Sequence, residues 1–295
     1  MCILFWTVDN HHDYKFIFAG NRDEFLSRPT KPAHVWFKNN KEDKFNIIGG
    51  TDMEPTASCE NGTWLGMTTD GRLAALTNFR EVKYEGRRSR GELVRDFLLM
   101  DNNQQSTVEN YMSHLQQTTS EYGGYSLVCF DLLKNEMAYF SNRDVEPHIQ
   151  YLSPKHIYGL SNSVLSNPWE KVKQGQEAMK ILLKDESLTE KQMIENLFNI
   201  LRSSEPFNDP TNIGQVMTDF KERIFIPKLN NKELGNNASY ATRTSTVILV
   251  DRQDNVIFVE RDWFECIEDN YQECKVPETR RFIFRLKESH IVNNV

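Results

Sequence analysis

Short apolar runs separated by tight-turn residues are the feature that most constrains how this 295-residue chain can fold. Three pairs of runs flank two-residue turn signals, at Asp70-Gly71, Lys134-Asn135 and Gln253-Asp254, and each pair predicts a β-hairpin. The expected strands are 64–69 with 72–77, 125–131 with 136–141, and 245–251 with 255–261. Runs that are apolar throughout are typical of sheets covered by other layers on both faces.

Two further apolar runs open the chain, residues 2–8 and residues 15–19, and the second is expected to end at Gly20. Helical spacing occupies 92–100, 108–117 and 168–184, and Pro168 suits a first helical turn. Ser187-Leu188-Thr189-Glu190 matches a capping box and predicts another helix. The segments 203–215 and 228–240 are rich in turn-forming residues and are expected to be loops.

Strands, a helical middle and strands again indicate an α+β fold. We expect the late strands to return to the early sheets, which makes residues 1–295 one intertwined domain. The chain end, from about 265 to 295, is expected to be peripheral.

Composition excludes several classes of function. Lys and Arg number 35 and Asp and Glu 42, so the formal net charge is −7, which argues against nucleic acid as the main partner. No apolar run reaches the ~18 residues of a membrane helix, and the first residues lack the features of a secretory signal or mitochondrial presequence. Five scattered cysteines without metal-binding spacing indicate a reducing compartment and predict a cytoplasmic protein.

Cys2 is the most informative single residue. Removal of the initiator methionine is common when the second residue is small, and it would leave a cysteine with a free α-amino group. The amine titrates near ~8 and the thiol near ~8.5, so one residue would hold a nucleophile and its base. The alternative is that Cys2 is a small apolar residue that packs at the start of a buried strand.

The next cluster, Gly20-Asn21-Arg22-Asp23-Glu24, follows the second apolar run directly. If the first two strands form a hairpin, Arg22 and Cys2 lie at the same end of it. A guanidinium in that position would lower the pKa of the thiol. The alternative is a solvated turn with an Arg–Asp ion pair.

Several motifs resemble the transport and Golgi organisation 2 family, also called the NRDE family after residues 21–24. The matching segments are Met1-Cys2-Ile3, the NRDE tetrad, 62–66, 76–81, 90–94, 158–162, 168–172 and 242–251. They occur in consistent order from residue 1 to about 260. The family is in turn similar to cysteine N-terminal nucleophile (Ntn) hydrolases, whose fold is a four-layer αββα sandwich of two antiparallel sheets.

The resemblance implies a role for each candidate residue. Cys2 would be the nucleophile, Arg22 would polarise it and Asp23 would hold the amino group. Asn78 and Asn162 would orient the amine or donate to an oxyanion, and Arg243 would close the site. The residues expected to contact substrate are Asn21, Glu24 and Trp64, and no metal site is expected.

The implied activity is hydrolysis of an acyl amide or thioester, with a small acyl substrate and no resident cofactor. Relatives are linked to Golgi organisation, protein secretion, lipid metabolism and haem movement. Two alternatives follow: a carrier or chaperone for haem or an acyl-lipid, and a secretory-pathway scaffold with an unknown protein partner. His11-His12 is a candidate haem-ligand pair, although a charged loop accounts for it better. Peripheral association with mitochondria or Golgi is a further expectation.

Overall fold

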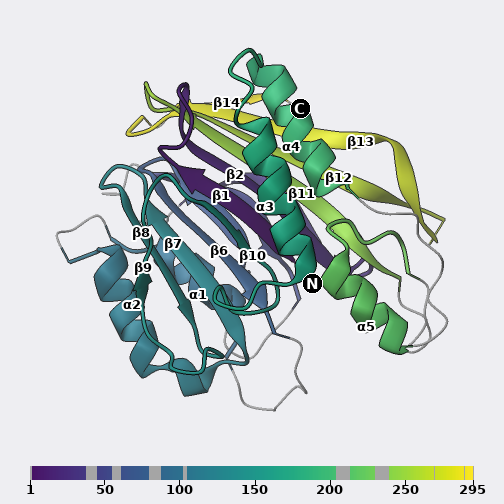
Figure 1. The fold of residues 1–295 in the computed structure, drawn as a ribbon, viewed down its shortest axis with the longest axis horizontal. Coiled ribbons are helices and arrows are strands. Elements are labelled where there is room, and N and C mark those ends of the chain that lie inside the picture. The colour runs from purple at the N-terminus through teal and green to yellow at the C-terminus, as the bar shows by residue number, and fades with distance from the viewer. Residues whose placement is uncertain are drawn as a thin grey trace.

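The computed structural model describes residues 2–37, 45–54, 61–79, 88–101, 105–203, 213–229, 239–268, 270–288 and 290–294. Within these residues the strands form two antiparallel sheets (Figure 1). In spatial order, the first sheet holds β10 (Ile157–Leu160), β1 (Ile3–Val8), β2 (Tyr14–Phe25), β11 (Tyr240–Asp251), β12 (Asn255–Ile267), β13 (Asn270–Arg285) and β14 (Ile291–Asn294). The second holds β3 (Thr30–Phe37), β4 (Asn46–Asp52), β5 (Leu65–Thr68), β6 (Arg72–Asn78), β7 (Tyr125–Asp131), β8 (Glu136–Ser141) and β9 (Gln150–Tyr151).

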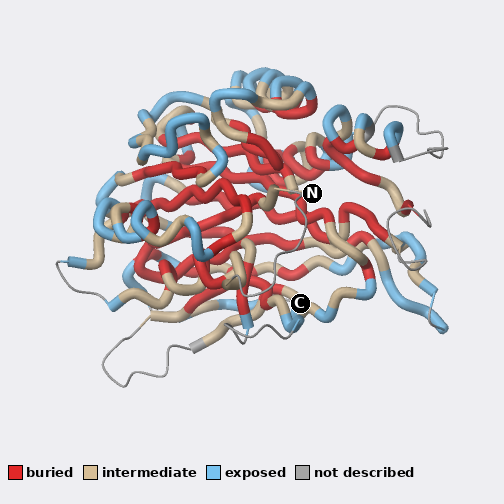
Figure 2. Tube along the Cα trace, turned by 90° about the horizontal axis from the view of Figure 1, so that it is seen from below, coloured by how far each residue is buried: buried red, intermediate tan, exposed pale blue. Residues whose placement is uncertain are grey.

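Helices cover the outer face of each sheet. These are α1 (Gly91–Leu98), α2 (Val108–Gln117), α3 (Glu170–Leu182), α4 (Glu190–Leu201) and α5 (Ile213–Glu222), with a 3-10 turn at Thr119–Glu121. Apolar side chains of α1 and α2 pack on the second sheet, and those of α3 and α4 pack on the first. A third apolar cluster fills the space between the sheets, so the buried trace in Figure 2 lies inside an exposed outer layer. This arrangement confirms the predicted α+β, four-layer αββα sandwich.

Early and late parts of the chain share the first sheet. β2 lies between β1 and β11, and its register pairs Asn21 with Ile3 on one side and with Ser245 on the other. In Figure 1 the purple first strands therefore lie beside the green and yellow last ones. The expectation that the late strands return to the early sheet is confirmed.

The three predicted hairpins are present as β5–β6, β7–β8 and β11–β12. Each turn contains a residue in the left-handed region: Gly71 at φ 94°, Asn135 at φ 56° and Asp254 at φ 69°. Glycine, asparagine and aspartate tolerate this conformation better than other residues. The local turn chemistry was therefore sufficient to place these hairpins.

Three local predictions were wrong. β2 does not end at Gly20 but continues to Phe25, because β11 pairs with it along this whole stretch, whereas β1 pairs with it only as far as Asn21. The capping box of α4 is formed by Thr189 and Gln192, two residues later than predicted. Pro168 lies before the N-cap of α3, Trp169, and not in the first helical turn. Most of the two predicted loops, residues 204–212 and 230–238, lies outside the described residues; α5 begins at Ile213 and β11 at Tyr240, within the predicted last residues of each loop.

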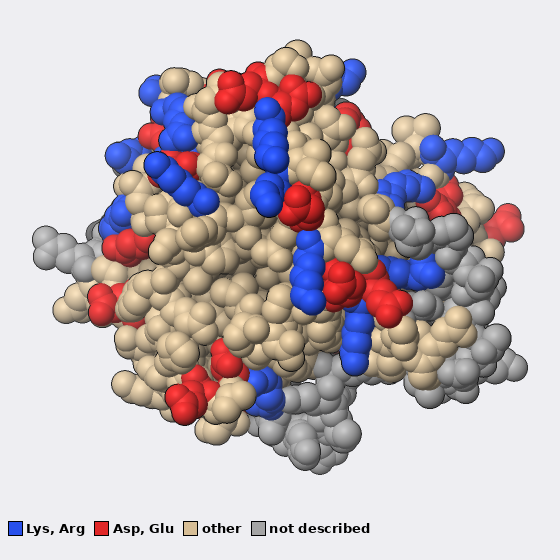
Figure 3. Space-filling model, in the orientation of Figure 1, with Lys and Arg blue, Asp and Glu red and all other residues tan. Residues whose placement is uncertain are grey.

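The chain end adds β13 and β14 to one edge of the first sheet, and Phe282, Phe284 and Leu286 are buried between the sheets. None of the described helices is long and apolar enough to cross a membrane. On the face drawn in Figure 3, acidic and basic side chains are interspersed and form no single basic patch.

Candidate active site

Cys2 lies directly before β1, where Ile3 pairs with Asn21 of β2. Its carbonyl oxygen accepts a hydrogen bond from Ser161 Oγ at 2.7 Å, which fixes the start of the chain against the segment after β10. Burial raises the pKa of the Cys2 thiol, while the backbone N–H of Asp23 and the charge of Arg22 oppose that rise. The expected lowering by Arg22 is therefore present but is outweighed, and the thiol needs a base before it can act as a nucleophile.

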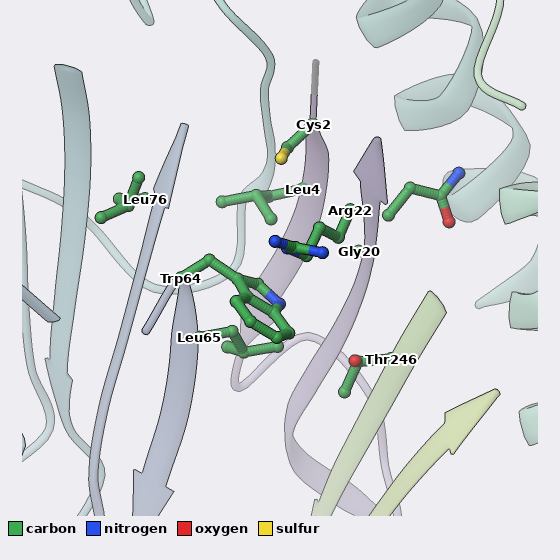
Figure 4. Close-up of a pocket in the computed structure, with 9 residues that line it drawn as sticks. Cys2, Leu4, Gly20, Arg22, Trp64, Leu65, Leu76 and Thr246 are labelled. Atoms are coloured by element: carbon green, nitrogen blue, oxygen red, sulfur yellow. The ribbon is translucent and has the colours of Figure 1, made fainter. Parts of the chain in front are cut away.

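Arg22 projects from β2 into the space between the sheets, where its guanidinium is 5% exposed. Its Cζ atom lies 4.1 Å from the centre of the Trp64 ring, and Nη2 lies 3.6 Å from Glu24 Oε2. Figure 4 shows the guanidinium between the Cys2 thiol and the indole. Nη1 is buried and has no hydrogen-bond partner among the described residues, so a donor is available there for an anionic or carbonyl group.

Alternation along β2 sends neighbouring residues of the tetrad to opposite faces. Arg22 faces the second sheet, whereas Asp23 faces the helices. Asp23 Oδ1 accepts from Thr242 Oγ1 at 2.6 Å. Burial raises the pKa of the Asp23 carboxyl, and the positive charge of Lys171 on α3 opposes that rise. The sheet thus holds a cation on one face and a carboxylate on the other, both beside Cys2.

The pairing of β11 with β2 contains a β-bulge beside Arg22 and Asp23. Thr242 pairs with Asp23 and Thr244 pairs with Arg22, so Arg243 is the extra residue of β11. Arg243 Nη1 donates to the carbonyl oxygen of Arg28 at 2.6 Å, and its charge lowers the pKa of Arg22. Arg243 therefore lies near Arg22 and hydrogen-bonds to the connection between β2 and β3.

The side-chain amide of Asn21 is hydrogen-bonded to other parts of the protein. Its Nδ2 donates to the carbonyl oxygens of Leu201 and Ile224 at 2.8 and 3.0 Å, and its Oδ1 accepts from Ser245 Oγ at 2.6 Å. Ser245 Oγ also accepts from the indole N–H of Trp263. These bonds tie β2 to the helical layer, and they favour a structural role for Asn21 over the predicted substrate contact.

Asn78 and Asn162 come together from different sheets. Asn78 ends β6, and Asn162 follows β10; Asn162 Nδ2 donates to the carbonyl oxygen of Asn78. Thr77 Oγ1 donates to the carbonyl oxygen of Ser161, which in turn holds Cys2 through its hydroxyl. Asn78 Oδ1 is buried and lacks a hydrogen-bond partner in the described part of the chain. Both predicted asparagines therefore lie in the immediate surroundings of Cys2.

A small cavity opens beside these groups. Its lining residues are Cys2, Leu4, Gly20, Asn21, Arg22, Trp64, Leu65, Leu76 and Thr246 (Figure 4). Its volume is about 10 Å³, enough for one water molecule and too small for an acyl chain. Of the predicted substrate contacts, Asn21 and Trp64 line the cavity, whereas Glu24 lies between Arg22 and Arg28.

Lys171 is the residue of this site that the sequence interpretation missed. It lies in the first turn of α3 with no exposed surface, and its Nζ atom has no hydrogen-bond partner among the residues described. Burial lowers the pKa of Lys171, and Asp23 and Cys2 oppose that change. A signal was available, because Lys171 lies four residues before Gly175 on the buried stripe of α3, where a lysine is unusual.

The residues that could hold a metal ion lie elsewhere. Within the described residues, His11, His12 and Asp13 have donor atoms within 4.8 Å of one another. They occupy the turn between β1 and β2, at the opposite end of β1 from Cys2. The predicted haem-ligand pair is therefore separate from the candidate active site.

Comparison with known proteins decides the family. Residues 1–265 match the family described as Transport and Golgi organisation 2. This chain belongs to that family. A human Transport and Golgi organization protein 2 homolog is 34% identical over 302 residues, covering 97% of this chain and all of that protein. A mouse homolog is also 34% identical, over 280 residues that cover 90% of this chain and 94% of the relative.

The chain also resembles a solved acylase structure. Penicillin V acylase from Agrobacterium tumefaciens has a TM-score of 0.48 and 12% sequence identity, and the alignment covers 95% of this chain and 90% of the acylase.

Proposed function

We propose that this family member is an N-terminal cysteine hydrolase that acts on an acyl amide or thioester. The observation that carries the proposal is the convergence of separate elements on Cys2. Arg22 and Asp23 come from β2, Asn78 from β6 and Asn162 from the segment after β10. Two of these residues carry buried polar atoms, Arg22 Nη1 and Asn78 Oδ1, that have no hydrogen-bond partner among the described residues. A buried donor and acceptor left open are costly unless a ligand or water uses them.

The chemistry requires removal of Met1, after which the α-amino group of Cys2 takes the proton of its thiol. The sulfur attacks the carbonyl carbon of the substrate, and a tetrahedral oxyanion forms. As the oxyanion collapses, the carbon–nitrogen or carbon–sulfur bond breaks, and the leaving group takes the proton from the amine. Water then attacks the carbonyl carbon of the acyl-enzyme, the carbon–sulfur bond breaks and the sulfur takes up a proton, which releases the carboxylic acid and restores the thiol.

Each neighbouring residue has a matching role in this scheme. The open Oδ1 of Asn78 suits an amine N–H, and Asp23 suits the ammonium form of the same amine. The open Nη1 of Arg22 suits the oxyanion, and one such donor typically contributes ~3 kcal/mol to the transition state. Since the cavity holds only one water molecule, the acyl chain must displace side chains such as Trp64 or approach from outside it.

The test begins with the mass of the intact protein from its own cells. The wild type is then treated with substoichiometric iodoacetamide, and the alkylated cysteine is located by peptide mass spectrometry. Turnover is measured on a panel of acyl amides and thioesters. Cys2→Ala removes the nucleophile, and Cys266→Ala is the matched control, since Cys266 is an exposed free cysteine.

We expect loss of Met1, preferential labelling of Cys2, and turnover that Cys2→Ala abolishes and Cys266→Ala retains. Retained Met1, or turnover unchanged in Cys2→Ala, would contradict the proposal. Saturable binding of haem or acyl-CoA without turnover would favour the carrier alternative. A stable protein partner from cell extract, again without turnover, would favour the scaffold.

Our proposals for the cellular setting are a cytoplasmic location with peripheral association with mitochondria or Golgi, and links to secretion, lipid metabolism and haem handling. They are supported by the family resemblance alone. Fractionation of cells that express the full chain tests the location.

A further inference from the structure

Lys171 occupies a position that packing alone does not explain. Its side chain is fully buried in the first turn of α3, next to Val172 and on the same stripe as Gly175 and Met179. The Nζ atom lies 5.7 Å from the centre of the Trp169 ring and has no hydrogen-bond partner in the described structure. A buried ammonium without hydrogen bonds is strongly unfavourable unless an opposite charge compensates it.

The compensating groups are those of the candidate active site. Asp23 and Cys2 are the titratable groups that act on Lys171, and each favours its charged form. Asp23 points from β2 toward the helices, as its bond with Thr242 shows. Figure 1 places the start of α3 beside the N-terminus of the chain. The start of α3, which carries Lys171, therefore lies near the start of the chain and on the same side of the first sheet as Asp23.

Neighbouring residues of β2 act on the Cys2 thiol in opposite directions. From β2, Asp23 disfavours a thiolate, whereas Arg22 favours it. Arg22 is itself influenced by Glu24, Arg243 and Asp52, so its charge is partly compensated. The amino-terminal charge acts in the same direction as Arg22. The pKa of Asp23 is lowered first by the amino-terminal charge and then by Lys171, which is the cation that α3 supplies.

We propose that Lys171 is a positioning residue of the candidate active site, whose buried positive charge offsets the negative charge of Asp23 and favours the thiolate form of Cys2. The inference deepens the proposed hydrolase function and rests on it. Since electrostatic coupling is reciprocal, a thiolate that stabilises the Lys171 ammonium is stabilised by it to the same extent.

The test measures the rate of Cys2 alkylation by iodoacetamide against pH, with the modified peptide resolved from those of the other cysteines. The variants are Lys171→Met, which keeps the length of the chain and removes the charge, and Lys171→Arg, which keeps the charge. Lys173→Met is the matched control, because Lys173 is an exposed lysine on the same helix. The readout needs neither methionine removal nor a substrate.

We expect Lys171→Met to raise the apparent pKa of Cys2 alkylation by about one unit or more, as removal of a nearby unit charge does. Lys171→Arg should retain most of the wild-type midpoint, and Lys173→Met should leave it unchanged. A folded Lys171→Met protein with the wild-type midpoint overturns the inference. A shifted midpoint without any hydrolysis upholds the role of Lys171 and counts against the hydrolase instead.

A second measurement serves if Lys171→Met does not fold. The wild type is labelled with ¹³Cε-lysine, and the Lys171 resonance is titrated before and after alkylation of Cys2. Alkylation removes the thiolate, so the midpoint of Lys171 should fall. An unchanged midpoint would show that the two groups are not coupled and would overturn the inference.

Discussion

Replacement of Asn21 by alanine tests whether the first residue of the tetrad serves the fold or the substrate. In the structure its amide satisfies two carbonyl oxygens, of Leu201 and Ile224, and its Oδ1 accepts from the hydroxyl of Ser245. Each buried polar group that loses its partner costs about 1–3 kcal/mol. Asn21→Ala should therefore lower the free energy of unfolding by roughly 3–5 kcal/mol, a large fraction of the total for a typical domain.

The assay is urea unfolding followed by tryptophan fluorescence, with Cys2 alkylation measured in the absence of urea. Asn255→Ala is the matched control, because Asn255 is an exposed asparagine that also hydrogen-bonds through its side chain. It should change stability by less than about 0.5 kcal/mol. Where Asn21→Ala remains folded, Cys2 should be alkylated at close to the wild-type rate. Wild-type stability combined with loss of turnover would refute this reasoning and return Asn21 to the substrate site.

Two further predictions concern the space between the sheets. Burial, with the nearby charge of Asp262, raises the pKa of Glu260 from 4.5 to about 7, so the folded state favours the protonated carboxyl. The resulting contribution to the free energy of unfolding is complete below pH 4.5 and is lost as the pH rises through 7, by up to about 3 kcal/mol. The thermal unfolding midpoint of Glu260→Gln should therefore depend less on pH between 5 and 8 than that of the wild type. Parallel plots of the two midpoints against pH would contradict this prediction. A Cβ atom on Gly50 would lie 2.4 Å from Trp64, so Gly50→Ala should cost about 1–3 kcal/mol by overpacking and displace the ring from Arg22. Combining Gly50→Ala with Trp64→Leu should recover part of the loss in urea unfolding, and strict additivity would show that the ring is not the obstacle.

The sequence by itself determined the parts of this protein that depend on neighbours along the chain. Gly71, Asn135 and Asp254 mark hairpin turns because the preference for a left-handed backbone belongs to a single residue. Apolar runs identified buried strands, and their order along the chain indicated the class of fold. The motif resemblance identified the family, and its candidate residues Cys2, Arg22, Asn78 and Asn162 lie close together in the structure.

Tertiary structure alone decided which face each site residue occupies and what it contacts. The polar tetrad continues β2 because β11, more than 200 residues later, supplies partners such as Thr242 and Ser245. The bulge at Arg243 depends on the paired strand as well as on its own sequence. Lys171 comes within the electrostatic influence of Asp23 and Cys2 only because α3 packs on β1 and β10. These contacts link residues far apart in the chain, and neither periodicity nor turn propensity carries information about them.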